Sequence, residues 1–352
     1  MASILPKKPW FTLVFPYILY FILQQAKSHK PDTTNYTLQK YEKWLQKYER
    51  VYQSQNEQQL RFGIYKSNLE YINYINSQNL SYKLTDNKYA DMTHEEFSTF
   101  HFGYNGQEHS DSGELNNSHS KSNTTEDLPE DVDWRKRGAV THVRDQDHCG
   151  ACWAFSAVAA IEGINKIKGG NLTILSEQML VDCDVNNGDK GCRGGIMEKA
   201  YQFVKKNGGI TTEQVYPYVG IDEGCNKSKA KDTVVRIRGY ESIKSKDEKS
   251  LQSAVAKQPV SVPIAAEFLF QLYGSGVYSG PCAAHLNHAV TVVGYGKEEE
   301  DDDEKEGRKY WIIKNSWGTD WGENGYMRLE RGTEEKGGKC GIAKDSTYPV
   351  LI

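Results

Sequence analysis

Two cysteines three positions apart, Cys149 and Cys152, could support three kinds of chemistry. A structural zinc site needs a second ligand pair at matching spacing, and the sequence contains no second CxxC motif. A redox CxxC is typical of a small βαβ fold in an intracellular protein, and neither condition fits this chain. The remaining interpretation splits the pair, with Cys149 in a disulfide and Cys152 as a separate thiol.

The cysteine count supports this division. All seven cysteines lie between residues 149 and 340, and an odd number leaves at least one thiol over or paired outside the chain. Cys152 suits that thiol because it begins CWAFSAVAAIEGINKIK, residues 152–168, which predict a buried helix. Free N–H groups and the helix dipole at such a position stabilise a nucleophilic thiolate. A thiolate of this kind still needs a base.

Among the histidines, His288 is the best candidate for that base. His94, His101, His109 and His119 lie in the first 127 residues, and His142, His148 and His285 lie in loop-like surroundings. His288 opens the strand-like run HAVTVVGYG, 136 residues after Cys152 (288 − 152), so only the fold can bring the two together. A purely structural role for His288 stays open on this evidence.

The elements that must position these residues fall into two halves. The helix over 152–168 belongs to the first half. After about residue 256, the runs PVSVPIA, HAVTVVGYG, KYWIIKNSW and GYMRLERG predict strands separated by Gly and Asn turns. A groove between a helical half and a β half is a natural place for a ligand.

The chain as a whole has the organisation of a pro-protein. An apolar run, Phe11–Leu23, follows two lysines and is too short to cross a bilayer, so we interpret residues 1–28 as a secretory signal peptide. An uncleaved membrane anchor is the alternative. Residues 29–104 lack cysteine, residues 105–127 have almost no apolar side chain and predict a processing linker, and residues 128–352 hold every cysteine. Secretory entry favours disulfides.

Within residues 29–104, six side chains recur at helical spacing and predict one face of an amphipathic helix. Because this face mixes polar and apolar types, a specific packed network is an alternative to a simple core face. The six are Glu57, Arg61, Tyr65, Asn68, Ile72 and Asn76.

The net charge and the short motifs of the chain say less about its function than the cysteines and histidines do. The formal net charge of −4, without a Lys/Arg run, gives no support for nucleic-acid binding. Residues 297–307, KEEEDDDEKEG, predict a solvated acidic loop between two strands, with partner binding as the alternative. Six N-glycosylation sequons, the first at Asn35, are candidate glycan sites. No metal or cofactor is expected.

Three separated motifs, CGACWAF at 149–155, LNHAV at 286–290 and KNSWGTDWGENGY at 314–326, resemble those of papain-family cysteine proteases. The helix of residues 57–76 and TDNKYAD at 85–91 resemble the inhibitory pro-segment of cathepsin L-like, plant-type precursors. The resemblance implies an α+β, two-lobed papain-like fold, with a helical left lobe and a β-barrel-like right lobe. It also implies an α-helical inhibitory pro-domain over residues 29–104 and a mature peptidase over residues 128–352.

The resemblance also assigns catalytic roles. Cys152 is the nucleophile, His288 its partner, and Asn315 orients the imidazole beneath Trp317. Gln146 and the backbone N–H of Cys152 form the oxyanion hole. Asp147 and His148 depart from the family pattern, in which Gly follows the Gln. A left-handed backbone at Asp147 would be costly without Gly.

The substrate groove and the disulfides follow from the same resemblance. The groove is expected to involve Gly194, Gly195, Ile196, Met197, Pro263, Leu286, Asn287, Trp317 and Asp345. The apolar members favour a large apolar side chain two residues before the scissile bond, and Asp345 at the pocket floor would also accept Lys or Arg. The implied disulfides are Cys149–Cys192, Cys183–Cys225 and Cys282–Cys340.

The expected function is a secretory-pathway cysteine endopeptidase, made as a zymogen and active in a lysosome or vacuole or outside the cell. Protein and peptide substrates, its own pro-segment and cystatin-type inhibitors are the expected partners, with no membrane or nucleic acid, and a monomer is expected. Acid would favour release of the pro-segment by protonating carboxylates such as Asp91. The alternatives are a catalytically weak relative that serves as a peptide-binding or storage protein, or a transpeptidase.

Overall fold

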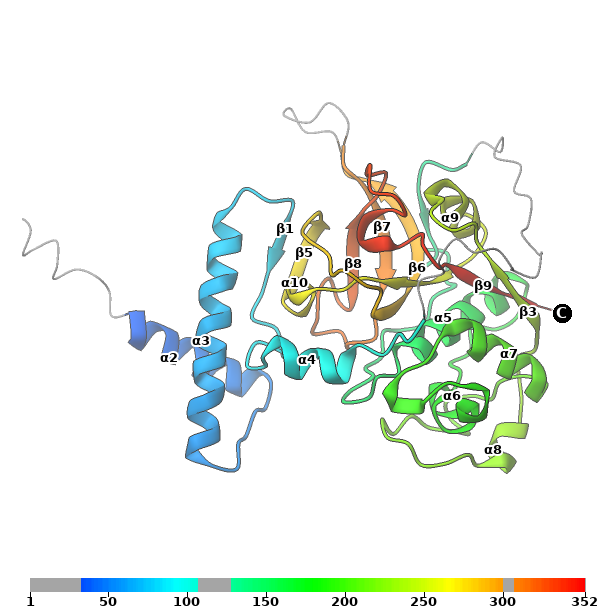
Figure 1. Cartoon of the computed structure of the whole chain (residues 1–352), viewed down its shortest axis with the longest axis horizontal. Helices are drawn as coiled ribbons and strands as arrows, with labels where there is room; N and C mark the ends of the chain where they lie inside the picture. The colour runs from blue at the N-terminus through cyan, green and yellow to red at the C-terminus, as the bar shows by residue number, and fades with distance from the viewer. Residues whose placement is uncertain (1–32, 107–127, 300–306, 352) are drawn as a thin grey trace, which may run out of the picture. The chain divides into compact units, whose positions relative to one another are not determined.

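The computed structural model describes residues 33–106, 128–299 and 307–351 (Figure 1). The predicted signal peptide, nearly all of the predicted linker and the centre of the acidic run lie outside these residues. Within them, no helix combines the length and apolar character that a bilayer crossing requires. The chain divides into two units, Met1–Phe62 and Gly63–Ile352, which are described in turn.

The first unit is built on aromatic packing between two helices. Helix α2 spans Thr33–Lys47, and helix α3, Gln55–Ser77, begins in this unit. Tyr41 stacks on Trp44 with ring centroids 5.8 Å apart, and it also meets Phe62 at 5.1 Å. Glu57 and Arg61 lie on α3 in this unit. Large aromatic side chains of this kind supply most of the apolar surface that a short pair of helices can bury.

In the second unit, one face of α3 fixes the segment that follows it. Asn76 forms two hydrogen bonds of 2.8 Å with the backbone of Leu84. Asn68 Nδ2 donates to the carbonyls of Ala90 and Met92, and Tyr65 donates to Asp86. Together with the buried side chain of Ile72, these are the contacts of a packed network rather than of a simple core face.

One nine-stranded sheet, in the part of the chain that the structure describes, runs through the second unit in the order β1-β5-β8-β7-β6-β4-β9-β3, with β2 paired to β6. All pairs are antiparallel except β5 with β8. The strands are β1 Tyr82–Leu84, β2 Val132–Asp133, β3 Ile237–Ser242, β4 Val260–Ile264, β5 Tyr273–Tyr278, β6 His288–Lys297, β7 Lys309–Lys314, β8 Tyr326–Glu330 and β9 Thr347–Leu351.

The four runs predicted as strands form β4, β6, β7 and β8. Every residue of β6 is buried except Lys297, because the sheet closes around it on one side and α5 covers it on the other. Strand β1 belongs to the segment predicted to be the pro-segment, and it extends the sheet by pairing with β5. Residues 82–84 are therefore part of the same hydrogen-bonded sheet as the strands that follow residue 128.

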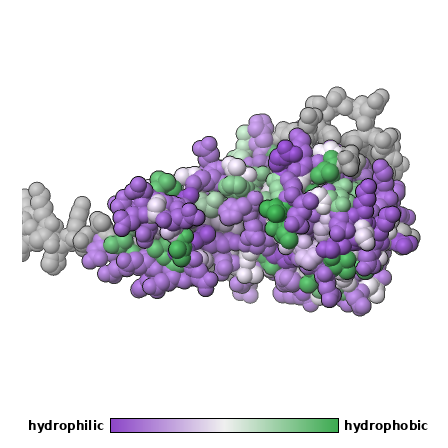
Figure 2. Space-filling view, turned by 90° about the horizontal axis from the view of Figure 1, so that it is seen from below, coloured by the Kyte–Doolittle hydropathy of each residue, from purple (hydrophilic) through white to green (hydrophobic). Residues whose placement is uncertain are grey.

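Helices α5, α6, α7 and α8 together form the other half of this unit (Figure 1). Helix α5 spans Cys152–Ile167, one residue shorter than predicted, and its small side chains allow close packing on all sides. The other helices are α4 His94–His101, α6 Glu177–Cys183, α7 Met197–Asn207, α8 Lys227–Lys231, α9 Glu248–Val255 and α10 Phe268–Gln271, with short 3₁₀ turns η2 Asp184–Asn187, η3 Gly191–Arg193 and η4 Lys339–Gly341. The face in Figure 2 is mostly hydrophilic, with hydrophobic residues in small groups, as is usual for a water-facing surface.

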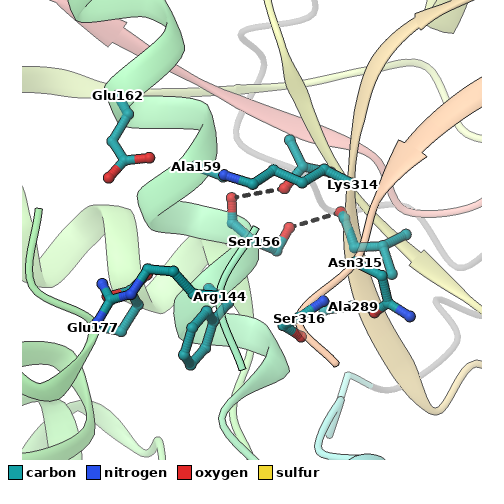
Figure 3. Close-up of a pocket in the computed structure, with 12 residues that line it drawn as sticks. Arg144, Ser156, Ala159, Glu162, Glu177, Ala289, Lys314, Asn315 and Ser316 are labelled. Atoms are coloured by element: carbon teal, nitrogen blue, oxygen red, sulfur yellow. Dashed lines mark hydrogen bonds and ion pairs between the residues drawn. The ribbon is translucent and has the colours of Figure 1, made fainter. Parts of the chain in front are cut away.

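A small cavity of about 20 Å³ lies between α5 and strands β6 and β7, surrounded by buried charges (Figure 3). Lys314 Nζ donates to Thr141 Oγ1 at 2.7 Å, and Thr141 donates to Glu162 Oε2 at 2.6 Å. Arg144 forms ion pairs with Glu177 and Glu213 beside them. Burial raises the pKa of Glu162, and the positive charge of Lys314 opposes that rise. The charged form of Glu162 therefore depends on the presence of Lys314. These charges join the helical half to the sheet.

Replacing Lys314 by methionine should lower the free energy of unfolding by about 3–5 kcal/mol, because the carboxyl group of Glu162 would remain buried without its cation. Urea denaturation of the whole chain carrying Cys152→Ala, which removes the free thiol, would measure this change. Lys309→Met at the exposed end of the same strand is the matched control, with a change within about 0.5 kcal/mol. Equal effects of the two substitutions would contradict a structural role for the buried pair.

Candidate active site

The position of Cys152 is fixed by the turn that precedes α5. Cys149 is bonded to Cys192, and Gly150 N–H donates to the Cys192 carbonyl at 2.8 Å. Cys152 is then the first residue of α5, where the helix has no side-chain cap. Its Sγ accepts a hydrogen bond from the backbone N–H of Ala289 at 3.4 Å. The thiol of the helical half therefore contacts the second residue of strand β6.

His288, the residue before Ala289, belongs to a polar and aromatic group on the β half. Its Nε2 donates to Asn315 Oδ1 at 2.8 Å, and both residues are buried. The indole ring of Trp317 stacks on the imidazole with centroids 4.6 Å apart and shields this hydrogen bond from water. Within the described residues, His288 Nδ1 has no hydrogen bond of ordinary geometry, although the backbone of His101 lies near enough to raise the pKa of the ring. Nδ1 is therefore the nitrogen that can serve the thiol.

Gln146 is completely buried next to this group. Its Nε2 donates to the Cys149 carbonyl at 2.8 Å and to the carbonyl of His101, a pro-segment residue, at 3.3 Å. Its Oε1 accepts a hydrogen bond from Ser316 Oγ at 2.6 Å. The amide group expected to serve as an oxyanion-hole donor thus already donates a hydrogen bond to the carbonyl oxygen of His101.

The pro-segment crosses the site as an extended strand. Gly195 N–H donates to the Gly103 carbonyl at 2.9 Å, and Tyr104 N–H donates to the Asn287 carbonyl at 3.0 Å. The N–H of Asn105 donates to the Gly195 carbonyl at 3.1 Å, the third backbone hydrogen bond of this series. A Cβ atom on Gly103 would lie 1.9 Å from the Gly150 carbonyl oxygen, so only glycine allows this approach. The same close fit explains Gly194, where a Cβ would meet the Gly103 oxygen at 2.6 Å.

Tyr104 fills the pocket predicted for substrate. It shares an apolar cluster with Met197 and Leu286, and Ile196 packs against this cluster. Its hydroxyl donates to Asp345 Oδ2 at 2.5 Å. Pro263 lies in β4 opposite Ala289.

Sequence analysis missed two members of this region, Ala265 in the apolar cluster and Glu198 near Asp345. Neither residue stands in a recognisable local pattern. Only the crossing of chain segments brings them to the pocket.

Covering by the pro-segment holds both reacting groups neutral. Burial raises the pKa of the Cys152 thiol to about 11, against the opposing effect of N–H groups from Ala289 and Gly103. Burial also lowers the pKa of His288 to about 4, against the hydrogen bond to Asn315 and the His101 carbonyl. Between these two pKa values burial favours the neutral thiol and the neutral imidazole, so the expected thiolate–imidazolium pair is disfavoured while residues 101–105 cover the site.

His101 ends helix α4 directly above the site, although sequence analysis set it aside as a pro-segment residue. Its ring is buried and stacks on Phe97 at 4.4 Å, with the rings of Tyr89 and Trp317 edge-on. Its Nδ1 lies 2.9 Å from the Phe97 carbonyl.

The charged and titratable groups around His101 are mostly basic. They are His148, Lys88 and His288, with Asp145 ion-paired to Lys88 and Asp147 beside His148. Burial, together with these three basic neighbours, lowers the pKa of His101 to about 3, against the hydrogen bond to the Phe97 carbonyl, which raises it.

The remaining cysteines pair as the family resemblance implies, Cys183 with Cys225 and Cys282 with Cys340. Cys152 is the one free cysteine of the seven, all of which lie in the described residues. Asp147 adopts φ +49°, the left-handed backbone that glycine would favour, and its N–H donates to Asp145 Oδ1. His148 is exposed and meets the ring of Phe100 at 5.1 Å.

Comparison with known proteins places this geometry in a family. Residues 128–350 match the papain family cysteine protease domain, and residues 41–97 match the cathepsin propeptide inhibitor domain. The chain therefore belongs to the papain family of cysteine proteases. It is a cysteine endopeptidase precursor that carries its own inhibitory pro-segment.

Similar proteins extend over most of the chain. A KDEL-tailed cysteine endopeptidase of Arabidopsis thaliana, CEP2, is 47% identical over 318 residues, 89% of this chain and 85% of that protein. A senescence-specific cysteine protease of the same plant, SAG12, is 46% identical over 318 residues, 88% of each protein. The structure of recombinant stem bromelain precursor aligns with a TM-score of 0.81 at 40% identity, covering 90% of this chain and 99% of that one.

Gly103→Ala should expose the thiol of the intact zymogen at neutral pH, because the added methyl group collides with the Gly150 carbonyl. We expect a Cys-directed epoxide to label Cys152 in this variant while the wild-type zymogen stays unlabelled. Gly63→Ala on α3 is the matched control, since a Cβ there meets no atom within 4 Å. A G103A zymogen as resistant to labelling as the wild type would show that the glycine contact does not hold the pro-segment in place.

Acid should release the pro-segment through His101. Its pKa lies at about 3 when it is covered, against an ordinary value of 6.5. Protonation therefore favours the released form, and docking weakens as pH falls from 6.5 towards 3. Linkage gives a weakening of about 25-fold between pH 7 and pH 5 from this group alone.

His101→Phe keeps the aromatic packing and removes this titration. Rates of activation measured across that pH range should depend less steeply on pH in the variant, while His142→Gln, at an exposed site, should follow the wild type. The same pH dependence in H101F and wild type would assign the acid response to other groups.

Proposed function

We propose that this protein hydrolyses internal peptide bonds through a thioester on Cys152 once the pro-segment has been removed. One observation carries the proposal: a free thiol at the start of α5 touches β6 beside His288, while Gln146 holds a carbonyl oxygen next to it. Cysteine proteases need these three parts, a nucleophile, a base and an oxyanion donor.

The chemistry follows from the positions of the groups. The Cys152 sulfur attacks the peptide carbonyl carbon, and the carbonyl oxygen gains negative charge. His288 gives its proton to the leaving amine nitrogen as the C–N bond breaks. Water then attacks the thioester, His288 takes a proton from that water, and the C–S bond breaks to release the acid. Asn315 keeps the imidazole ring in the orientation that both transfers need.

Gln146 Nε2 and the Cys152 N–H stabilise the charged oxygen in this scheme. The His101 carbonyl accepts a hydrogen bond from Gln146 in the precursor, so the pro-segment supplies a neutral oxygen where the transition state develops a charged one. A donor at such a position typically contributes about 10²–10³ to the rate.

Labelling of the nucleophile tests the proposal. The purified zymogen would be incubated in mild acid, treated with an epoxysuccinyl peptide and mapped by mass spectrometry. We expect an adduct on Cys152 and loss of the residues before Leu128. A correctly shortened chain without adduct or activity would contradict the proposal and favour a peptide-binding or storage protein. Amide products formed from an added amine in place of hydrolysis would indicate a transpeptidase.

The pocket around Tyr104 supports a preference two residues before the scissile bond. Its walls are apolar, and its floor carries the carboxyl groups of Asp345 and Glu198. Burial and the neighbouring Asp345 raise the pKa of Glu198 to about 8, so this group is neutral in mild acid. We infer that the pocket accepts large apolar or aromatic side chains and, through Asp345, lysine or arginine.

Cleavage of Phe-Arg and Arg-Arg fluorogenic substrates should both be measurable. Asp345→Ala should lower kcat/KM for Arg-Arg about tenfold, the effect of losing one charge-assisted hydrogen bond, and leave Phe-Arg within about twofold. Asp232→Ala, at an exposed site after α8, is the control. Absence of Arg-Arg cleavage by the wild type would rule out the basic preference.

We also infer entry into the secretory pathway, with activity in a lysosome or vacuole or outside the cell. The features that support this are the apolar run within residues 1–28 and three disulfides in the described body, since disulfides persist in oxidising compartments. Glycosylation, a monomeric state and inhibition by cystatin-type proteins stay predictions.

A further inference from the structure

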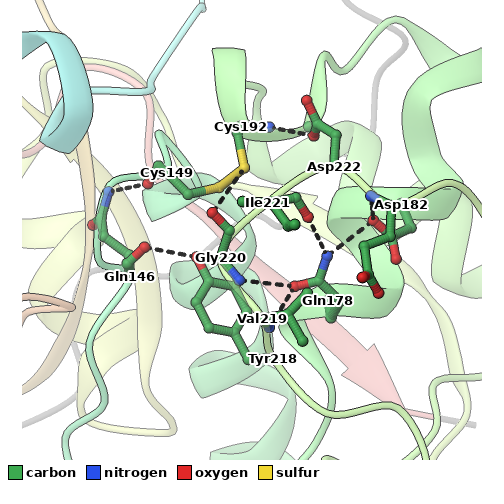
Figure 4. The surroundings of a disulfide bond; sticks show 12 residues. Gln146, Cys149, Gln178, Asp182, Cys192, Tyr218, Val219, Gly220, Ile221 and Asp222 are labelled. Atoms are coloured by element: carbon green, nitrogen blue, oxygen red, sulfur yellow. Dashed lines mark hydrogen bonds between the residues drawn. A yellow bond between two sulfur atoms is a disulfide. The ribbon is translucent and has the colours of Figure 1, made fainter.

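The main chain of Gln146 is held from both halves of the molecule. On the β side, its N–H donates to the Ser316 carbonyl at 2.8 Å, and Ser316 Oγ donates to its side-chain oxygen. On the helical side, the hydroxyl of Tyr218 donates to its carbonyl oxygen at 2.8 Å. Figure 4 shows Tyr218 reaching Gln146 from the loop of residues 216–223, which passes beside the Cys149–Cys192 disulfide.

The peptide that receives this hydrogen bond leads into a residue with left-handed backbone. Asp147 follows Gln146 at φ +49°, a conformation that is uncommon for residues other than glycine and that aspartate adopts more readily than most. The loop passes close enough that a Cβ on Gly220 would lie 3.8 Å from the Asp147 Cβ and 3.9 Å from the Gln146 carbonyl oxygen. The loop thus packs against the backbone that sets the direction of the Gln146 side chain.

Tyr218 is itself a rigid donor. Its ring meets Phe155 of α5 edge-on, with centroids 4.9 Å apart and an interplanar angle of 82°. Its N–H donates to Glu213, and Gln178 Oε1 accepts the N–H groups of Val219 and Gly220 that follow it. Burial, aided by nearby carboxylates such as Glu177, raises the pKa of the phenol well above its usual range, so the hydroxyl keeps its proton.

We propose that Tyr218 is a positioning residue for the oxyanion hole: its hydroxyl fixes the Gln146 carbonyl, and thereby keeps Nε2 of Gln146 aimed at the developing oxyanion. This inference rests on the proposed role of Gln146 in catalysis. Tyr218 touches no reacting atom in this account. It acts through the Gln146 carbonyl, which its hydroxyl holds on the helical side while Ser316 holds the Gln146 N–H on the β side.

The same loop offers a matched control. The hydroxyl of Tyr216 donates to Asp182 Oδ2 at 2.7 Å, and within the described residues it forms no hydrogen bond with Gln146. Tyr216→Phe removes the phenol hydrogen bonds with Asp182, Gly224 and Asn226, and Tyr218→Phe removes the one with Gln146. Only the second removes a contact with the oxyanion hole.

The test compares acid-activated enzymes whose active-site concentration has been titrated with an epoxysuccinyl peptide. Y218F should lower kcat about fivefold, the effect of one hydrogen bond, with KM unchanged. Y216F should keep the wild-type kcat although its thermal midpoint falls at least as far as that of Y218F, because it loses more hydrogen bonds. Q146A should lower kcat strongly, and Y218F added to Q146A should have no further effect, because the two residues act as one unit.

Several outcomes would overturn the inference. An unchanged kcat in Y218F, or an equal loss in Y216F, would reduce Tyr218 to a structural contact. A fivefold loss on top of Q146A would show that Tyr218 acts by another route. An unchanged kcat in Q146A would show that Gln146 is not part of the oxyanion hole, and Tyr218 would then have no positioning role. A separate outcome, a wild-type enzyme whose Cys152 can be labelled but which has no activity before labelling, would count against the proposed function itself.

Discussion

A thiol at the start of a buried helix has to meet an imidazole at the start of a buried strand, and the rest of the molecule depends on that meeting. Cys152 opens α5 and His288 opens β6, so the two groups sit at the ends of the most deeply packed elements of their halves. Ends of rigid elements hold side chains more precisely than loops do. The buried charges behind them, Glu162 and Lys314, join the helix to the sheet and keep this junction closed.

Residues 101–105 occupy the groups and the pocket that are proposed to serve the substrate. Gly103 approaches the Gly150 carbonyl as closely as a backbone can, Tyr104 fills the pocket down to Asp345, and the His101 carbonyl accepts a hydrogen bond from Gln146. Under the proposed function, inhibition and catalysis use the same hydrogen-bond donor, Gln146 Nε2. The covered site is neutral because burial disfavours both the thiolate and the imidazolium, and it carries a buried histidine whose protonation opposes docking.

Sequence alone gave the elements with strong local signals. The small-residue helix from Cys152 and the strand from His288 were predictable because composition and periodicity mark them, and the motif resemblance supplied their partner Asn315. The roles of His101, Glu198 and Tyr218 were not predictable. Each depends on contacts between segments far apart in the chain, such as the 72 residues between Tyr218 and Gln146. The pairing of β1 with β5 was missed for the same reason, since a three-residue strand has too few residues to show a period.

The central claim is that the catalytic pair is assembled but uncharged under the pro-segment. The most direct measurement is the ultraviolet absorbance of the Cys152 thiolate at neutral pH, taken as the difference between each protein and its Cys152→Ala variant, before and after activation. The account predicts no thiolate signal in the zymogen and the signal of one thiolate in the activated enzyme. A full thiolate signal in the intact zymogen would contradict it, because the pair would then be charged beneath its cover.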